Sequence, residues 1–270
     1  MSIMESKVVF IGAGNMAEAI AGGMVNAEFC AAEKIVMTDV RPERLDDLKA
    51  TLGISTSTDN RVVKNAEIVV LAVKPQVMND VLKDLAPVLR KETLIISIAA
   101  GITSEKIEAA LGDGVRVVRV MPNTPALIGR GASGLAAGSL ADEADLEVAE
   151  AILGCVGVTV RVEEKDLDAV TALSGSGPAY VFYLLEAMLS AAEEMGLKKE
   201  TARTLALQTV EGSARLMKDS GEEAADLRAK VTSKGGTTFA AITSMEESGV
   251  KDAIVKALQA AKARSVELSL

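Results

Sequence analysis

Short runs of β-branched and other apolar residues alternate with helical patterns from the N-terminus to about residue 163. Runs of this length and Val/Ile content are typical of strands that are buried on both faces of a sheet. A chain that alternates strands and helices pairs its strands in parallel, because each helix carries the chain back across one face of the sheet. The pattern predicts a doubly wound, mostly parallel α/β sheet. The predicted strands are Val8–Ile11, Lys34–Thr38, Ile68–Val73, Thr93–Ile98, Arg116–Met121, Gly131–Ala137 and Val158–Val162.

Two of the intervening helices have clear patterns. An Ala-rich helix is predicted over Asn15–Ala27, directly after the first strand. From Val77 to Leu89 the apolar residues follow the 3.6-residue repeat of an α-helix, so one face of that helix is expected to be buried.

A glycine turn, Gly12-Ala13-Gly14-Asn15-Met16-Ala17, joins the first predicted strand to the first helix with the spacing GxGxxA. Gly12 permits a tight turn, Gly14 lets the backbone approach a pyrophosphate, and Ala17 keeps the helix close to the strand. The helix N-terminus then presents unpaired N–H groups to the phosphates. In this strand–turn–helix context the motif predicts a dinucleotide-binding Rossmann domain. The predicted contacts are Gly12, Gly14, Asn15, Met16 and Ala17.

The end of the second predicted strand is where a Rossmann domain distinguishes NAD from NADP. Asp39 is suited to accept hydrogen bonds from both ribose hydroxyls, which favours NAD. Arg41 is suited to neutralise a 2′-phosphate or to stack on adenine, which favours NADP. Both residues are also of the kind that only solvates a loop, so the sequence leaves this choice open.

Two more turns follow predicted strands and are candidates to line the nicotinamide crevice. The first runs from Ala72 through Val73, Lys74 and Pro75 to Gln76, and the second is Met121-Pro122-Asn123-Thr124-Pro125. Strand ends of a doubly wound sheet lie beside the bound nucleotide, so Lys74 and Gln76 are candidates to line the crevice and Asn123 and Thr124 to reach the cofactor amide. The alternative is that each turn is only a rigid connection.

From Glu164 onward the sequence predicts helices and no strand. Apolar residues surround much of the stretch from Val181 to Met195, and the stretch Pro178–Leu189 is interpreted as a buried helix rather than a membrane span because Glu186 interrupts it. So much apolar surface predicts packing inside a dimer, with a small core of its own as the alternative. We therefore predict two domains, a dinucleotide-binding domain over residues 1–163 and a helical one over 164–270.

Composition excludes several kinds of chemistry. The chain has no histidine, which excludes an imidazole base and histidine metal ligands, and we predict no metal site. Its two cysteines, Cys30 and Cys155, form no CxxC and no disulfide framework, which predicts a reducing, cytoplasmic location. With a formal charge of −9 and no basic cluster, nucleic acid and anionic membranes are not expected as partners.

Two polar stretches of the helical half differ from packing segments. Ser174–Tyr180 places small flexible residues before the long apolar helix, and Val231–Thr238 is a loop rich in glycine and hydroxyl groups that opens another helix. Such a loop presents backbone N–H groups and hydroxyls to an anion, here a substrate carboxylate. A simple helix cap is the alternative, although two adjacent glycines among four hydroxyl residues exceed what capping needs.

Taken in order, Gly12–Ala17, Val73–Gln76, Met121–Pro125, Leu173–Tyr180 and Val231–Thr238 resemble the successive motifs of pyrroline-5-carboxylate reductase. The resemblance implies a Rossmann domain followed by an all-α dimerisation domain, and reduction of Δ1-pyrroline-5-carboxylate to L-proline. It also implies a preference for NADPH, with NADH used by some members, and dimers that often build decamers.

The resemblance also assigns roles to residues. Backbone amides of the loop would hold the substrate carboxylate, and the hydroxyl of Thr238 would meet the ring nitrogen; Asn60 resembles a position that contacts the adenosine 2′-phosphate. This chain departs from the family pattern at Lys234, where proline is usual, and at Ala229-Lys230, where an Asp-Gln or Asp-Asn pair is usual. The substrate-binding residues so implied are Val231, Ser233, Gly235, Gly236, Thr237 and Thr238, with cofactor contacts also at Ala72, Val73, Lys74, Pro75 and Asn123.

The missing histidine agrees with this chemistry. A cyclic imine can take its proton before the hydride arrives, so the protein needs only to position the ring and hold the charge.

Two rival functions are a β-hydroxyacid dehydrogenase and a non-catalytic dinucleotide sensor. The first typically uses a lysine on the first long helix after the Rossmann domain, and Ser174–Leu189 contains none. The second would not need the Val231–Thr238 loop.

Overall fold

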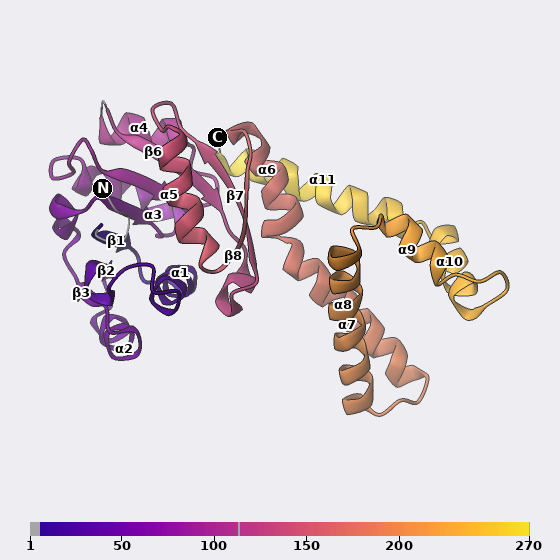
Figure 1. Cartoon of the computed structure of the whole chain (residues 1–270). Helices are drawn as coiled ribbons and strands as arrows, with labels where there is room; N and C mark the ends of the chain where they lie inside the picture. The colour runs from indigo at the N-terminus through magenta and orange to yellow at the C-terminus, as the bar shows by residue number, and fades with distance from the viewer. Residues whose placement is uncertain (1–5, 113, 270) are drawn as a thin grey trace. The chain divides into compact units, whose positions relative to one another are not determined.

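The computed structural model describes residues 6–112 and 114–269 and contains one eight-stranded sheet (Figure 1). The strand order is β3-β2-β1-β4-β5-β6-β7-β8. All neighbouring pairs are parallel except β6 and β7, which are antiparallel. The mostly parallel, doubly wound sheet predicted from the alternation is confirmed. The strands are β1 Val8–Ile11, β2 Ile35–Thr38, β3 Ser55–Ser57, β4 Ile68–Leu71, β5 Leu94–Ser97, β6 Arg116–Met121, β7 Gly131–Ala137 and β8 Gly157–Arg161.

The sheet has a helical layer on each face. Val8 and Phe10 of β1 belong to one apolar cluster and Val9 and Ile11 to the other, because successive residues of a strand point to opposite faces. The first cluster includes residues of α1 (Asn15–Asn26), α2 (Pro42–Leu52) and α5 (Glu143–Gly154). The second includes residues of α3 (Pro75–Leu85), α4 (Ser104–Leu111) and the 3₁₀ turn η3 (Asn60–Asn65).

Two details of this half differ from the sequence prediction. The strand β3 was not predicted, because its residues Ser55-Thr56-Ser57 carry no apolar pattern and it is held at the sheet edge by backbone pairing with β2. The helix predicted to run to Leu89 ends at Leu85. Pro87 explains the early end, since it has no N–H with which to continue the hydrogen bonds of the helix.

The rest of the described chain is helical, as predicted. After β8 come the short turn η5 (Glu164–Asp166), helix α6 (Leu167–Val170) and the π-helical turn η6 (Thr171–Gly175). The longer helices that follow are α7 Gly177–Glu194, α8 Lys199–Ser220, α9 Ala224–Lys230, α10 Thr237–Glu247 and α11 Val250–Ser269.

The chain forms two compact units. One contains the described residues up to Ser176 together with those from Ala261 onward, and the other is Gly177–Ala260. This division falls later than the domain boundary predicted near residue 163, because Leu167 and Ala172 are buried in the first unit. The predicted boundary between sequence domains remains a prediction.

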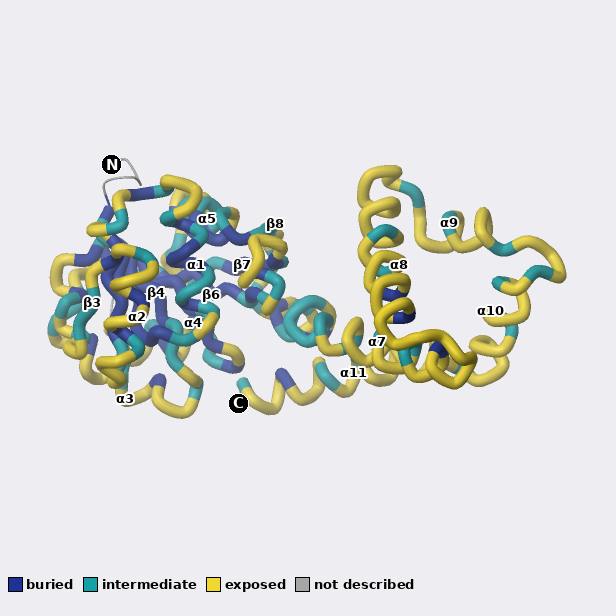
Figure 2. The backbone as a smooth tube through the Cα atoms, turned by 90° about the horizontal axis from the view of Figure 1, so that it is seen from below, coloured by how far each residue is buried: buried dark blue, intermediate teal, exposed yellow. Residues whose placement is uncertain are grey.

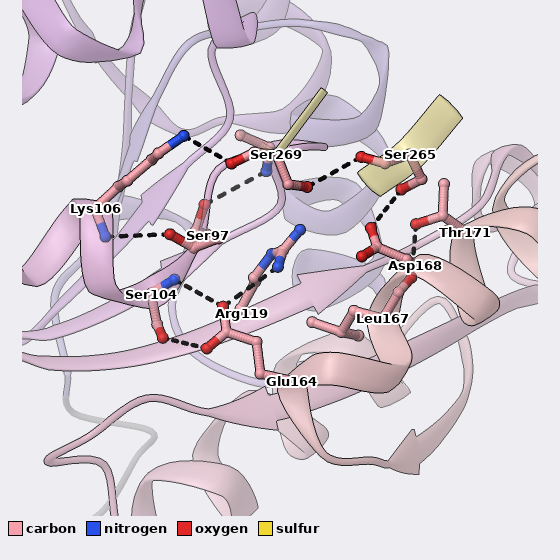
Figure 3. A network of polar contacts seen from close by, with 12 residues as sticks. Ser97, Ser104, Lys106, Arg119, Glu164, Leu167, Asp168, Thr171, Ser265 and Ser269 are labelled. Atoms are coloured by element: carbon pink, nitrogen blue, oxygen red, sulfur yellow. Dashed lines mark hydrogen bonds and ion pairs between the residues drawn. The ribbon is translucent and has the colours of Figure 1, made fainter. Parts of the chain in front are cut away.

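The last turns of α11 are fastened to the first unit by side-chain contacts (Figure 3). The Ser265 hydroxyl donates to Asp168 Oδ1 over 2.6 Å, and Lys106 Nζ donates to the Ser269 carbonyl oxygen over 2.7 Å. Next to them Glu164 accepts hydrogen bonds from the backbone N–H and hydroxyl of Ser104 and pairs with the buried Arg119. The segment that follows β8 and the C-terminal helix are thus both anchored beside α4.

Helix α7 is not the buried helix that its sequence suggests. Of its residues only Ala192 is buried, whereas Phe182 is 61% and Tyr183 is 76% exposed in the single chain. The prediction of burial is therefore wrong for one copy of the chain. No helix among the described residues is long and apolar enough to cross a membrane.

Candidate active site

The glycine turn lies where the chain leaves β1 for α1. Gly12 has φ +99°, and a Cβ atom added to it would lie 2.8 Å from the Ala72 carbonyl oxygen, so only glycine fits. Gly14 has an ordinary φ of −74°, and nothing lies within 4 Å of an added Cβ. The space beside Gly14 is therefore open. The start of α1 has no capping side chain there, so its backbone N–H groups face this space. Ala17 is buried against the sheet.

The turn after β4 lies beside the glycine turn. The Ala72 N–H donates to the Ile11 carbonyl oxygen over 2.9 Å, and the Val73 side chain would lie 3.0 Å from a Cβ on Gly12. Lys74 occupies the position before α3 without a capping hydrogen bond from its side chain, and Pro75 begins the helix. Since α1 and α3 cover opposite faces, the junction of β1 and β4 is the switch point at which doubly wound sheets bind nucleotides.

The Ala13 peptide is held on both sides by residues from the end of β2 and the start of α2. Its N–H donates to Asp39 Oδ2 over 3.0 Å, and its carbonyl oxygen accepts from Arg44 Nε over 3.0 Å. Arg44 also pairs with Glu18 of α1 over 2.5 Å. These contacts of Ala13, Arg44 and Glu18 are not predictable from local sequence, because they join residues far apart in the chain. They fix the shape of the turn before any ligand binds.

Asp39 and Arg41 follow the last residue of β2, and Asn60 contacts that residue; their roles at a ribose site stay a prediction. Arg41 binds the Asp39 carboxylate, with Nε 2.8 Å from Oδ1 and Nη2 3.1 Å from Oδ2. These hydrogen bonds from Arg41, with the one from Ala13, lower the pKa of Asp39 to about 2. Asn60 accepts a 2.7 Å hydrogen bond from the hydroxyl of Thr38, the last residue of β2.

Asn123 is bound to two other segments of the first unit. Its Nδ2 donates to the Ser174 carbonyl oxygen over 3.0 Å, and its Oδ1 accepts from the Ala132 N–H over 2.8 Å. Asn123 thus ties the end of β6 to β7 and to the π-helical turn η6. Of the two interpretations of this turn, these contacts favour a rigid connection for the side chain, and a cofactor contact at Asn123 stays a prediction.

The Val231–Thr238 loop lies in the second unit, between α9 and α10. Gly235 has φ +73°, and Gly236 occupies the position before the first turn of α10, where no side chain caps the helix. The Gly236 N–H is bonded to the Ser233 carbonyl oxygen over 3.0 Å. Thr237 and Thr238 then begin the helix, so their N–H groups are the uncapped donors of its first turn.

The two threonines of this loop differ in exposure. Thr237 is exposed, whereas Thr238 is half-buried. The loop as a whole presents backbone N–H groups at a positive helix end, which is the arrangement that binds a carboxylate. Substrate roles for Val231, Ser233, Gly235, Gly236, Thr237 and Thr238 remain predictions. Among the described residues, no group of three or more cysteine or carboxylate side chains is placed to hold a metal ion.

Comparison with known proteins gives two family models along the chain. The model described as "Pyrroline-5-carboxylate reductase dimerisation" matches residues 164–268, and "NADP oxidoreductase coenzyme F420-dependent" matches residues 7–101. Pyrroline-5-carboxylate reductases from Methanosarcina acetivorans and Pseudomonas aeruginosa are 45% and 46% identical to this chain, over 97% of both chains in each case.

Solved structures agree with these relatives. A pyrroline-5-carboxylate reductase from Coxiella burnetii superposes with a TM-score of 0.92 at 42% identity, covering 98% of this chain and 99% of the other. The Plasmodium falciparum pyrroline carboxylate reductase with NADP bound superposes with a TM-score of 0.90 at 30% identity, covering 99% of this chain and 100% of the other.

Proposed function

The chain belongs to the pyrroline-5-carboxylate reductase family, and from that membership we propose that it reduces Δ1-pyrroline-5-carboxylate to L-proline with NADPH. The observation that carries the proposal is the match to named relatives over 97% of both chains, which includes the glycine turn and the Val231–Thr238 loop. The neighbour with NADP bound supports NADPH as the reductant. NADH is the second candidate, because Asp39 is suited to ribose hydroxyls.

The proposed cofactor site is built from three segments of the first unit. The turn from Gly12 to Ala17 holds the pyrophosphate at the start of α1, while Asp39, Arg41 and Asn60 meet the adenosine ribose. The turn from Ala72 to Pro75, together with Asn123, borders the nicotinamide. The closeness of Gly12 to Ala72 and the open space beside Gly14 support this arrangement. When bound, the cofactor supplies the hydride.

The proposed substrate site is the Val231–Thr238 loop. Its backbone N–H groups hold the carboxylate, and the Thr238 hydroxyl orients the ring nitrogen. The nitrogen takes its proton before hydride reaches the adjacent carbon, so the C=N bond becomes a C–N bond with one N–H. No strong acid is needed from the protein, and catalysis consists of positioning and charge stabilisation. The uncapped start of α10 supports this role for the loop.

We further propose that residues 164–270 form both a dimerisation and a substrate-binding domain, and that five dimers build a decamer. The family model for dimerisation over residues 164–268 and the exposed apolar side chains of α7 support self-association. A cytoplasmic location is proposed from the two unpaired cysteines.

The test is to mix the protein with NADPH and Δ1-pyrroline-5-carboxylate and follow the nicotinamide absorbance, with proline measured as the product. We expect NADPH oxidation that depends on the imine and forms an equal amount of proline. If the protein instead oxidised a β-hydroxyacid and reduced NADP⁺ or NAD⁺, it would be a β-hydroxyacid dehydrogenase. Cofactor binding without turnover of either substrate would indicate a dinucleotide sensor and overturn the proposal.

A further inference from the structure

The Ser174–Tyr180 segment, which has no role in the proposed function, begins in the π-helical turn η6 and continues into α7. The Ser176 N–H donates to the Thr171 carbonyl oxygen over 2.8 Å, which is a π-helical bond rather than an α-helical one. Such turns are frequent at functional sites. The first unit runs to Ser176 and the second begins at Gly177, so this segment carries the chain from one unit into the other.

Pro178 removes a hydrogen-bond donor at this junction. In an α-helix the carbonyl oxygen of Ser174 accepts from the N–H of residue 178, and proline has no N–H. Asn123 Nδ2 lies 3.0 Å from the Ser174 carbonyl oxygen and donates to it. The Asn123 side chain therefore stands in for the N–H that Pro178 lacks.

The end of β6 holds the same turn at a second point. Met121, the last residue of β6, packs against Gly175, where an added Cβ would lie 2.7 Å from Met121 Cε. The half-buried Asn123 is itself fixed, because its Oδ1 accepts from the Ala132 N–H of β7 over 2.8 Å. The amide thus has a bonded partner at each end, and η6 is held on the sheet by Met121 and Asn123 together.

We propose that Asn123 is a positioning residue for hydride transfer, which acts by holding η6 on the end of β6 and so fixes the turn from which α7 starts. This inference rests on the proposed function and gives the Ser174–Tyr180 segment a role in it. Asn123 lies in the turn that follows β6, and the proposed substrate loop lies in the unit that begins at Gly177. A misplacement of the reacting groups by about 1 Å lowers the rate of transfer even where both ligands still bind.

The rival role for the Asn123 side chain is a direct contact with the cofactor amide. The two roles differ in what restores them. Alanine in place of Pro178 gives the backbone an N–H for the Ser174 carbonyl oxygen, and so replaces the bond from Asn123. It cannot replace a contact with the cofactor.

The experiment measures the Kd of NADPH by fluorescence titration, kcat with the imine, and hydrogen exchange of residues 171–180 by mass spectrometry. Asn123→Ala should lower kcat roughly 10- to 100-fold and leave the Kd of NADPH within about threefold, because only the position of η6 is lost. Residues 171–180 should exchange faster in this variant, since the turn opens more often.

Adding Pro178→Ala to Asn123→Ala should return kcat to within about threefold of the wild type and should restore the slow exchange. Thermal stability should stay below that of the wild type, because the Ala132 N–H still lacks its acceptor. This separation of kcat from stability distinguishes a positioning residue from one that only stabilises the fold.

Pro178→Ala alone and Ser174→Ala are the controls, and each should leave kcat within about threefold. The first only adds a donor, and the second removes only the hydroxyl bond to the Val170 carbonyl oxygen. A weaker Kd for NADPH in Asn123→Ala that Pro178→Ala does not restore would show a direct cofactor contact and overturn the proposal.

The proposal is also overturned if Asn123→Ala leaves kcat or the exchange of residues 171–180 unchanged, or if kcat recovers only together with thermal stability. A wild-type protein that binds NADPH without reducing the imine would refute the proposed function. The exchange measurement would then still show whether Asn123 holds η6.

Discussion

The two compact units bury their apolar residues in different ways. The first unit buries apolar side chains on both faces of its sheet, including Phe10, Ile20 and Met78. In the second unit the buried apolar residues are alanines, Ala192, Ala202 and Ala206. Figure 2 shows the contrast, with dark blue filling the sheet and yellow dominating α7 to α10.

The difference shows which half of the chain needs a second copy. Burying a Phe or Leu side chain stabilises a protein by roughly 1.5–3 kcal/mol, and alanines contribute far less. The second unit leaves its large apolar side chains, such as Phe182 and Leu205, exposed in the single chain. This unit lies within the stretch that matches a family dimerisation domain, and exposed apolar faces of this kind are typical of sites of protein association.

The largest effect is expected from a charge placed on the exposed face of α7. Phe182→Glu should prevent dimerisation and lower imine reduction by more than about 100-fold, because an unpaired charge in an apolar interface costs at least about 3 kcal/mol. NADPH affinity should change little, since the proposed cofactor site belongs to the first unit. Sedimentation and fluorescence titration measure the two effects.

Leu140→Glu is the control for this charge. Leu140 lies in the first unit and is 53% exposed, so the substitution adds the same charge to a surface outside the helical half. It should leave the protein dimeric and active. A Phe182→Glu protein that sediments as a 28.1 kDa monomer and still reduces the imine would contradict the comparison.

The next effect concerns the substrate loop. Thr238→Ala should lower kcat/KM for the imine roughly 10- to 100-fold, because it removes one hydrogen bond beside a developing charge, worth about 1.5–3 kcal/mol. Thr237→Ala should have a smaller effect, since Thr237 is exposed and Thr238 half-buried. Cofactor affinity should stay the same in both. Steady-state kinetics measure these effects. If kcat/KM of Thr238→Ala equalled that of the wild type, the loop would act through its backbone alone.

The glycine turn offers a test of how far the first unit builds its own site. Gly12→Ala should lower the free energy of unfolding by about 1–3 kcal/mol, because φ is +99° and the Ala72 oxygen lies 2.8 Å from the added atom. Gly14→Ala should leave stability nearly unchanged and weaken cofactor binding, since the added methyl enters the space proposed for the pyrophosphate. Thermal denaturation with and without NADPH distinguishes the two. Equal stability losses in both variants would show that Gly14 is structural.

The smallest expected effect is electrostatic. Lys234 has no ion pair within the described residues, whereas its neighbours Arg228 and Lys230 are paired with Glu246 and Glu222. Lys234→Gln should therefore raise KM for the anionic imine about threefold at low salt and have no effect near 1 M salt, where charges are screened within about 3 Å. Lys230→Gln is the control and should change KM less. A salt-independent rise in KM would show that Lys234 shapes the loop rather than attracting the substrate.

Most of the fold follows from local sequence. The Val/Ile runs predict strands such as β1 and β4, because a strand buried on both faces is apolar throughout. The polar strand β3 cannot be predicted in this way, because it joins the sheet only through backbone pairing with β2. The glycine turn is predictable for a similar reason, because Gly12 has a conformation that no other residue adopts easily.

The contacts that hold the site are less predictable. The hydrogen bonds of Ala13 with Asp39 and Arg44, and those of Asn123 with Ala132 and Ser174, join residues that are distant in the chain. Their partners are common polar residues with no special spacing. Apolar periodicity marks α7 as a helix that has to be covered, but it cannot say whether the covering residues come from the same chain. The expectation of burial within one copy is therefore wrong.

The return of α11 to the first unit has a consequence for the order in which the protein is made. Residues from Ala261 onward complete a unit whose other residues end at Ser176, and they are fastened to Asp168 and Lys106. A ribosome releases the chain from its N-terminus, so most of this unit emerges while its last helical turns are still unsynthesised. The nucleotide-binding half of the protein therefore begins to fold first and is finished last.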